Sequence, residues 1–380
     1  MKAVTALLEP AHQELWRRVS EWARRVLRPK LEPATDDEAR REARALLREI
    51  GGGGWLQALA SQDLRGICLV REAVAAQSPL ADAVVAIQGL GATALILGGT
   101  AEQRSRWVPG IIAGDVMAAF AMTEPEAGSD VAALTTTARH DDDGWILEGE
   151  KHLISNAGLA DIYLVFAKTS PEQGSRGISV FLVPSDTSGL SFEGAQVLAA
   201  AHPLGRIRFR NCRVLDSALV GERDRGFKLG MQTLDRLRPT VGAAACGLAA
   251  RALDEAIAHA LERRQFGQAL ADMPVVRAKV GQMATDLDAA RMLVYRAAWE
   301  QAHGAQRNSA SAAMAKLFAT EMAQRVVDEA VQIVGGIGVL VGHPVERLYR
   351  AVRALRIYEG ASDIQRLIVA GGVFDEATNA

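Results

Sequence analysis

Cysteine is scarce in this sequence. The 380 residues include only Cys68, Cys212 and Cys246, an odd number that is spread widely along the chain. This scarcity excludes the disulfide framework that holds small secreted domains together, and it indicates a reducing compartment. The first ten residues contain neither a long apolar core nor a small-residue cleavage site, so we read no export signal there. We therefore expect a cytoplasmic protein.

An excess of charge of one sign and long apolar runs are lacking too. The 43 Lys and Arg residues nearly balance the 45 Asp and Glu residues, for a net charge of −2. This balance does not favour nucleic acid as a partner. No apolar run approaches the ~18 residues that a membrane span needs, so we expect no membrane partner. What remains is an ordinary globular composition, long enough for two or three domains.

The motifs of several common active sites are also missing. The seven histidines are scattered, and none pairs with another ligand at metal-site spacing, so no metal is predicted. No Gly-x-Gly-x-x-Gly follows a predicted strand, which argues against a nicotinamide site. A Gly-x-Ser-x-Gly nucleophile elbow is absent. Residues 51–54 are four glycines without a following Gly-Lys-Ser/Thr, and they indicate a break between helices instead of a phosphate loop.

The periodicity of apolar residues changes twice along the chain. Residues 1–118 show helical spacing, as at Leu15, Trp16, Val19 and Trp22. Residues 119–222 contain short apolar runs, a hairpin signal at residues 142–144 and strict alternation at 206–210, which is typical of a half-buried strand. From residue 223 to residue 380 the helical spacing returns. We therefore predict an α+β protein, mostly α, in which an antiparallel β domain separates an N-terminal helical domain from a C-terminal helical bundle.

Three polar loops are candidate binding sites. The first, residues 123–130, follows an apolar strand at 118–122, and its hydroxyl and backbone N–H groups suit a ligand's carbonyl or ring edge. A capped turn that opens a short helix explains the same string. The second loop is residues 151–157. The third, residues 332–338, is also consistent with a helix C-cap. Arg263 can pair with either a helix C-terminus or a phosphate, and its spacing does not decide between them.

An acidic residue, Glu359, lies between a tyrosine and a glycine just before a predicted helix. Gly360 allows a sharp turn there. Ser362 and Gln365 have the spacing of a capping box at the start of the helix. Taken alone, Glu359 is more readily interpreted as a solvated carboxylate at a helix N-terminus.

In this order, four segments resemble those of the acyl-CoA dehydrogenase family of flavoproteins. They are residues 121–130 (AMTEPEAGSD), 262–267 (ERRQFG), 332–338 (QIVGGIG) and 357–362 (IYEGAS). The resemblance runs from about Gly98 to Val369. It implies an N-terminal helical domain, a middle β domain, a C-terminal four-helix bundle, and an FAD that bridges two subunits of a homotetramer, a dimer of dimers.

Carried over position by position, the resemblance makes Glu359 the catalytic base. It would remove the α-proton of an acyl thioester while the β-hydrogen leaves as hydride to flavin N5. Such a base needs a dry pocket that raises its pKa. The implied cofactor-binding residues are Phe120, Met122, Thr123, Leu153, Ser155, Arg263, Phe266, Gln332, Gly335, Gly336, Ala361 and Asp363. The implied substrate-binding residues are Ser129, Asp235, Arg238, Tyr358 and Gly360.

The sequence departs from the family pattern next to the flavin. Leu153 stands where many relatives have a tryptophan, and Ala361 replaces a common threonine. The expected substrate is an acyl-CoA and the expected electron acceptor an electron-transfer flavoprotein. Three alternatives stay open at this stage. They are an acyl group on a carrier protein, a mainly binding flavoprotein such as a DNA-associated relative, and oxidase or monooxygenase chemistry enabled by Leu153.

Overall fold

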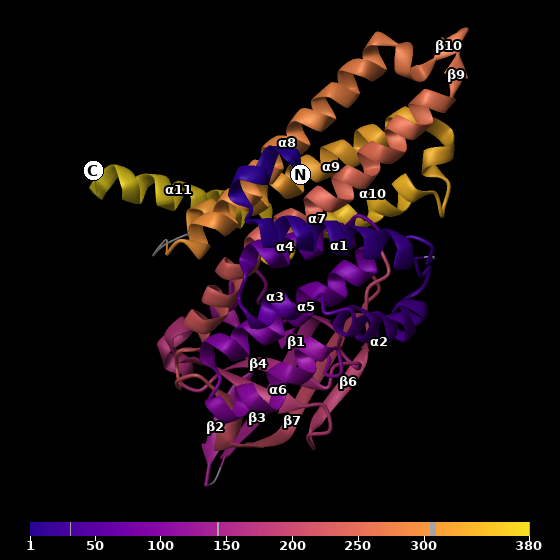
Figure 1. The fold of residues 1–380 in the computed structure, drawn as a ribbon. Helices are drawn as coiled ribbons and strands as arrows, with labels where there is room; N and C mark the ends of the chain where they lie inside the picture. The colour runs from indigo at the N-terminus through magenta and orange to yellow at the C-terminus, as the bar shows by residue number, and fades with distance from the viewer. Residues whose placement is uncertain (31, 143, 305–308, 380) are drawn as a thin grey trace. The chain divides into compact units, whose positions relative to one another are not determined.

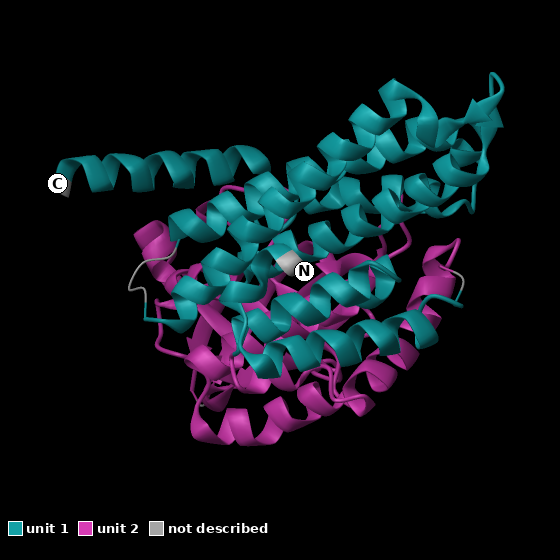
Figure 2. Cartoon of the chain, turned by 45° about the horizontal axis from the view of Figure 1, so that its top comes forward, with its two compact units in different colours: residues 1–31, 63–82, 235–380 teal, residues 32–62, 83–234 magenta. Residues whose placement is uncertain are grey.

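The computed structural model describes residues 1–30, 32–142, 144–304 and 309–379. The chain divides into two compact units, which are coloured separately in Figure 2. Unit 1 comprises residues 1–31, 63–82 and 235–380, and unit 2 comprises residues 32–62 and 83–234. Each unit therefore combines segments that are distant in sequence. The three-domain boundaries at residues 118/119 and 222/223 stay a prediction.

Unit 1 is built from helices and one short hairpin (Figure 1). Its helices are η1 (Lys2–Leu7), α1 (Pro10–Val26), α4 (Leu64–Ala75), the larger part of α7 (Gly226–Glu262), η5 (Leu270–Asp272), α8 (Pro274–Ala302), α9 (Ser309–Val334), η6 (Gly335–Val339), α10 (Pro344–Leu355) and α11 (Ser362–Asn379). The hairpin of β9 (Arg264–Gln265) and β10 (Gln268–Ala269) follows α7.

Small residues let the helices of unit 1 pack closely. Ala244 of α7, Ala298 of α8 and Ala323 of α9 are all fully buried in one core. A Cβ added to Gly242 would lie 2.7 Å from Val294 Cγ2, so α7 and α8 approach each other where α7 has no side chain. The apolar residues predicted at four-residue spacing, such as Met322 and Val326, lie in this core. The predicted C-terminal helical bundle is thereby confirmed.

Unit 2 combines helices with a sheet (Figure 1). Its helices are α2 (Asp36–Gly52), α3 (Gln57–Ala60), most of α5 (Pro79–Gly98), α6 (Ala101–Ala113) and the short η2 (Val131–Ala133), η3 (Pro171–Gly177) and η4 (Asp216–Ala218). Its strands are β1 (Ala118–Ala121), β2 (Thr137–Asp141), β3 (Gly144–Ser155), β4 (Ile162–Lys168), β5 (Ile178–Pro184), β6 (Leu190–Ala195), β7 (Leu204–Leu215) and β8 (Leu219–Val220).

The sheet has the strand order β6-β7-β3-β2-β4-β5-β8, and β1 pairs with β4. Most neighbours are antiparallel, as predicted, but β1 and β2 each run parallel to β4. Alternation along a strand reports which side chains are buried and carries no information about the direction of the neighbouring strand. The two parallel pairings are therefore an addition that the sequence pattern could not supply.

Strand β7 shows why the alternation at residues 206–210 was informative. Ile207 and Phe209 are 1% exposed, whereas Arg206 and Arg210 are exposed. The predicted hairpin is also confirmed, because β2 and β3 pair antiparallel with Asp141 opposite Gly144. Its central residue Asp143 lies outside the described residues.

Helix α5 is longer and more apolar than inspection of the sequence suggested. By length and composition alone it could cross a membrane, but 78% of its most apolar window is buried within the protein. A mostly buried core helix of a soluble protein passes the same test. The helix therefore does not overturn the expectation that the protein has no membrane partner.

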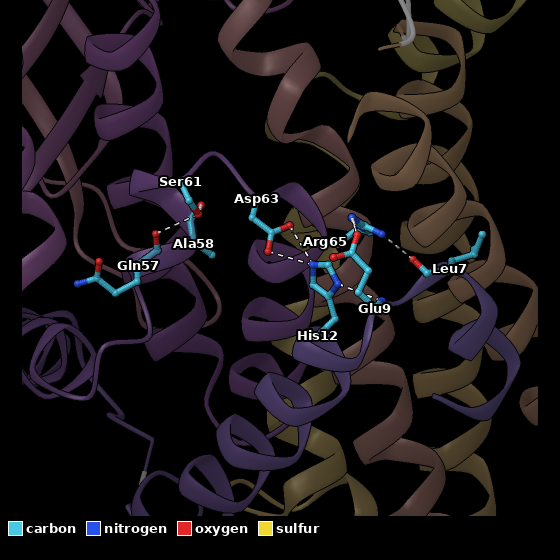
Figure 3. Close-up of polar contacts among 8 residues, drawn as sticks. All are labelled: Leu7, Glu9, His12, Gln57, Ala58, Ser61, Asp63 and Arg65. Atoms are coloured by element: carbon cyan, nitrogen blue, oxygen red, sulfur yellow. Dashed lines mark hydrogen bonds and ion pairs between the residues drawn. The ribbon is translucent and has the colours of Figure 1, made fainter. Parts of the chain in front are cut away.

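A polar cluster fastens the N-terminal helix to the start of α4 in unit 1 (Figure 3). His12 of α1 is 6% exposed, and its Nε2 lies 3.1 Å from Asp63 Oδ2. Arg65 donates to the Leu7 carbonyl at 3.1 Å and pairs with Glu9. The cluster thus joins two segments that are about fifty residues apart in sequence.

We expect Asp63→Asn to lower the free energy of unfolding by about 1 kcal/mol, because the hydrogen bond between Asp63 and His12 is only partly shielded from solvent. Burial alone would raise the pKa of Asp63, but the hydrogen bonds from His12 and the Gly66 N–H, together with the charge of Arg65, outweigh it and lower that pKa from 3.8. The contribution of Asp63 is therefore present above pH 3.8 and is lost as the pH falls. Urea denaturation at several pH values measures it. Glu14→Gln, which breaks the exposed Glu14–Arg17 pair of the same helix, is the control and should have little effect. Equal losses for both variants would contradict the prediction.

Candidate active site

The predicted catalytic turn connects α10 to α11 in unit 1, and its backbone is unusual. Glu359 has φ +53° and Gly360 has φ +98°. A left-handed conformation costs little at glycine but about 1–3 kcal/mol at another residue, and such strain is typical of functional sites. The positive φ therefore favours glycine at position 360, and a Cβ there would also displace the Gln365 amide, whose Nε2 would lie 2.3 Å away.

The predicted capping box at the start of α11 is wrong. Helix α11 begins at Ser362 itself, and the Ser362 hydroxyl donates to Glu321 Oε1 of α9 at 2.6 Å. The Gln365 side chain donates to the Gly360 carbonyl at 3.1 Å. Both side chains are thus engaged in fixing the turn to α9 and to itself.

The Glu359 carboxylate is shielded although the residue as a whole is partly exposed. Its Oε2 is buried and has no hydrogen-bond partner among the described residues. Burial raises the pKa of Glu359 above 4.5, and the nearby cations Arg71, Lys316 and Arg238 offset this only in part. A carboxylate with these properties can act as a base, because desolvation makes it a better proton acceptor.

Most of the cations around Glu359 are already neutralised. Arg71 of α4 is 1% exposed and donates from Nε and Nη2 to the two Asp82 carboxylate oxygens, both at 2.8 Å. Its Nη1 donates to the Thr240 hydroxyl at 2.9 Å. Arg238 of α7 is 4% exposed and pairs with Asp235. These two ion pairs surround the carboxylate with fixed polar groups instead of water.

The structure brings the predicted substrate-binding residues of unit 1 together. Arg238 Nη2 lies 3.7 Å from the position of a Cβ on Gly360, and the Asp235 carboxylate that pairs with Arg238 accepts the Ser309 hydroxyl at 2.7 Å. Burial of the Tyr358 side chain raises the pKa of its hydroxyl, which the charge of Arg71 offsets in part. Asp235, Arg238, Tyr358 and Gly360 therefore lie around Glu359.

The predicted cofactor residues of unit 1 fall into two groups, of which one lies away from Glu359 and the other beside it. Gln332 is 16 positions after Lys316 on α9, roughly 24 Å along the helix axis, and Gly335 follows that helix with φ +74° as its cap. Gly336 and Gln332 are exposed. Arg263 and Phe266 belong to the hairpin after α7, where Phe266 is 93% exposed. Ala361 and Asp363 flank the start of α11 beside Glu359, and Asp363 pairs with Arg366.

In unit 2, a buried ion pair holds the loop after β1. Lys151 Nζ lies 2.7 Å from Glu124 Oε1, and the two side chains are 0% and 3% exposed. Glu124 also accepts the backbone N–H groups of Thr135 and Thr136, and Lys151 donates to the Met122 carbonyl at 3.2 Å. Burial would raise the pKa of Glu124, but Lys151 and these donors lower it to about 2.

This arrangement places the two predicted flavin loops of unit 2 side by side. The His152 N–H donates to the Thr123 carbonyl at 2.9 Å, so Met122 and Thr123 adjoin Leu153 and Ser155. Leu153 lies at an irregularity of β3 with φ +55°, and its side chain is 48% exposed. Phe120 packs on Phe166 inside the unit, with ring centroids 4.8 Å apart. Ser129 is exposed on the loop that follows Thr123.

The polar groups on this edge fit the FAD that the resemblance implies. The Thr123 hydroxyl makes no hydrogen bond to any described residue, and Ser155 Oγ lies 2.8 Å from His202 Nε2. The exposed Leu153 side chain lies beside these hydroxyls and offers an apolar surface. An apolar face flanked by hydroxyl groups is suited to a flat, polar-edged ring.

Sequence reasoning missed the buried ions. Arg71 lies on α4, whose residues are all buried, and Lys316 lies on the buried row of α9 between Ala312 and Thr320. A charged residue at such a position needs a partner, because an unpaired buried charge is costly. That signal was present, but the sequence does not reveal which partner is met.

Comparison with known proteins matches most of the chain, in three consecutive segments, to one family. Models of the N-terminal, middle and C-terminal domains of acyl-CoA dehydrogenase match residues 9–115, 119–212 and 224–374. The probable acyl-CoA dehydrogenase FadE25 of Mycobacterium tuberculosis is 38% identical over 85% of this chain and 82% of its own length. The 3-(aryl)acrylate reductase of Clostridium sporogenes is 37% identical over 86% and 85%.

Solved structures agree. The butyryl-CoA dehydrogenase of Megasphaera elsdenii superposes with a TM-score of 0.91 at 29% identity, covering 97% of this chain and 99% of its own. A chain from the structure of the electron transferring flavoprotein of Acidaminococcus fermentans has a TM-score of 0.90 at 32% identity, covering 96% and 98%. A glutaryl-CoA dehydrogenase of Mycobacterium smegmatis in complex with FADH2 has a TM-score of 0.88 at 25% identity, covering 97% and 95%. The chain therefore belongs to the acyl-CoA dehydrogenase family, FAD-dependent oxidoreductases that act on CH–CH donors.

Proposed function

We propose that the protein dehydrogenates the α,β bond of an acyl-CoA and that Glu359 is its catalytic base. The observation that carries this proposal is the Glu359 carboxylate itself. It is held in a strained turn, its Oε2 is buried without a partner, and its pKa is raised. A structural carboxylate would be expected to accept hydrogen bonds, whereas one reserved for a substrate proton would not.

In the proposed reaction, a Glu359 oxygen takes the α-proton of the acyl thioester, and the electrons of that C–H bond form the new double bond. The bound FAD supplies the acceptor for the β-hydrogen, which leaves with its electron pair. The charge that develops on the thioester oxygen needs a donor, and the backbone N–H of Glu359 is suited to this role. Asp235, Arg238, Tyr358 and Gly360 would orient the acyl thioester, and the exposed Ser129 would contact its CoA portion.

The flavin ring would be bound by Thr123 and Ser155. Three further residues would lie near the ring, namely Phe120, Met122 and Leu153. Two more would meet the cofactor beside the catalytic turn, namely Ala361 and Asp363. Arg263, Phe266, Gln332, Gly335 and Gly336 would bind the FAD of a neighbouring subunit. Their exposure supports this assignment, since a 93% exposed phenylalanine in an ordered hairpin needs a cover. Further exposed apolar side chains of unit 1, at Val341, Leu367 and Phe374, support a homotetramer built as a dimer of dimers.

We further propose an electron-transfer flavoprotein as the electron acceptor, supported by the structural similarity described above. Cytoplasmic fatty acid metabolism is the proposed setting. The acyl-CoA chemistry of the family supports the metabolism, and the scarcity of cysteine supports a reducing compartment.

Anaerobic titration with a panel of acyl-CoAs tests the proposed function. We expect the purified holoenzyme to lose its visible flavin absorbance with at least one acyl-CoA, because hydride transfer reduces the ring. The same acyl group on a carrier protein should reduce the flavin more slowly. A fully loaded enzyme that no acyl-CoA bleaches would contradict the proposal, and faster reduction by the carrier-bound acyl group would favour the carrier-dependent reaction.

A further inference from the structure

Lys316 of α9 has an unusual environment. Its side chain is fully buried, and the ammonium donates a hydrogen bond to the Gly360 carbonyl at 2.8 Å. In the part of the chain that the structure describes, its Nζ forms no salt bridge with a carboxylate. Burying an ammonium without an opposite charge in contact is costly, so this lysine calls for a functional explanation.

The bond from Lys316 is one of two that hold the catalytic turn. The Gly360 carbonyl also accepts the Gln365 amide at 3.1 Å. The preceding peptide belongs to Glu359, whose left-handed backbone must be stabilised by its surroundings. Lys316 and Gln365 thus fix the same carbonyl from α9 and α11, one with a charged donor and the other with a neutral donor.

Lys316 also differs from the other charges that face the Glu359 carboxylate. These are Arg71 of α4, Asp82 of α5 and Arg238 of α7, together with Lys316. Arg71 is paired with Asp82, and Arg238 with Asp235. Lys316 itself faces Glu359, Arg238, Glu321 and Arg356, and the last two pair with each other. Of these three cations, Lys316 is the one whose ammonium contacts no carboxylate among the described residues, and its charge acts on Glu359 together with those of Arg71 and Arg238.

We propose that Lys316 is a positioning residue that fixes the Glu359 turn and lowers the pH at which the Glu359 carboxylate becomes deprotonated. This inference deepens the proposed function and rests on it. In physical terms, the Lys316 charge keeps the base ionised in a dry site, while its hydrogen bond keeps the carboxylate aimed. Burial lowers the pKa of Lys316 to about 8, so the lysine carries this charge at neutral pH and below.

The test follows the titration of Glu359 itself. In holoenzyme labelled with ¹³C at glutamate Cδ, the Glu359 signal is identified by its absence in Glu359→Gln. We expect Lys316→Met to raise the midpoint of this titration by about one pH unit, because it removes a nearby cation. Gln365→Leu, the matched control, removes only the neutral donor and should leave the midpoint unchanged. The rate of flavin reduction by acyl-CoA falls in acid, and the pH at which it is half-maximal should shift by the same amount as the titration midpoint.

Lys316→Arg keeps the charge and loses the titration near pH 8, since arginine stays protonated. In the parent, the Glu359 signal should therefore show a second shift near pH 8, when Lys316 loses its charge, and Lys316→Arg should lack this shift. The inference can thus be tested even if Lys316→Met does not fold. The inference would be overturned if Lys316→Met left the Glu359 midpoint unchanged or if Gln365→Leu shifted it equally. It would also be overturned if the shift of the Glu359 signal near pH 8 persisted in Lys316→Arg. A Glu359→Gln enzyme that stays active would instead refute the proposed function and leave the titration result standing.

Discussion

Glu359→Gln is expected to slow flavin reduction by acyl-CoA by about 10²- to 10⁴-fold, the contribution typical of a well-placed general base. Glutamine has nearly the same shape and can keep the left-handed turn, but it cannot accept the α-proton. Because the carboxylate oxygen Oε2 is buried without a partner, no described side chain is placed to take over its role. Anaerobic stopped-flow measurement of flavin absorbance at saturating acyl-CoA gives the rate.

Glu222→Gln is the matched control. Glu222 is also a carboxylate, but its side chain is 86% exposed and pairs with Arg225. Its loss should change the rate only slightly. A Glu359→Gln enzyme with full FAD content that reduces at the parental rate would remove Glu359 from the reaction.

The pH dependence of the parent should follow from the same carboxylate. Burial raises the pKa of Glu359 above 4.5, and the base must be deprotonated to react. The rate should therefore fall as the pH drops through this raised pKa, at a higher pH than for an exposed glutamate. In Glu359→Gln, the remaining rate should no longer fall as the pH drops through this range.

Local patterns in the sequence predicted the helices and strands well. The alternation in β7 and the four-residue rows of α9 follow directly from burial on one face, which is a property of the segment itself. The ordered motifs around Thr123, Arg263 and Glu359 likewise indicated the family. Each of these signals lies within a few neighbouring residues.

What the sequence could not supply are contacts between distant segments. Arg71 and Lys316 face Glu359 only because α4 and α9 pack beside the turn, and nothing near position 359 encodes them. The capping box failed for the same reason, since Glu321 of α9 takes the Ser362 hydroxyl that was expected to cap α11. Tertiary partners thus overrode a correct local pattern.

Lys151→Met is expected to lower the free energy of unfolding by about 3–5 kcal/mol, because it leaves the Glu124 carboxylate buried without its cation. Methionine fills nearly the same space, so the loss reports the charge and not a cavity. Lys151 also donates to the Met122 carbonyl, next to the loop proposed to bind the flavin. We therefore expect weaker FAD retention as well, measured as flavin released on gel filtration. Arg213→Met, which breaks the exposed Arg213–Asp141 pair of the same sheet, should cost less than about 1 kcal/mol.

The pH dependence of this loss identifies its cause. In the parent, the environment lowers the pKa of Glu124 from 4.5 to about 2, so its contribution to stability is present above pH 4.5 and is lost as the pH falls toward 2. Without Lys151, burial is no longer offset by the cation, and the pKa of Glu124 should rise. The free energy of unfolding of Lys151→Met should then fall less steeply with acid than that of the parent, and the two curves should approach each other at low pH. Parallel curves over this range would show that the Lys151 charge does not stabilise Glu124, and the loss would have to come from packing alone.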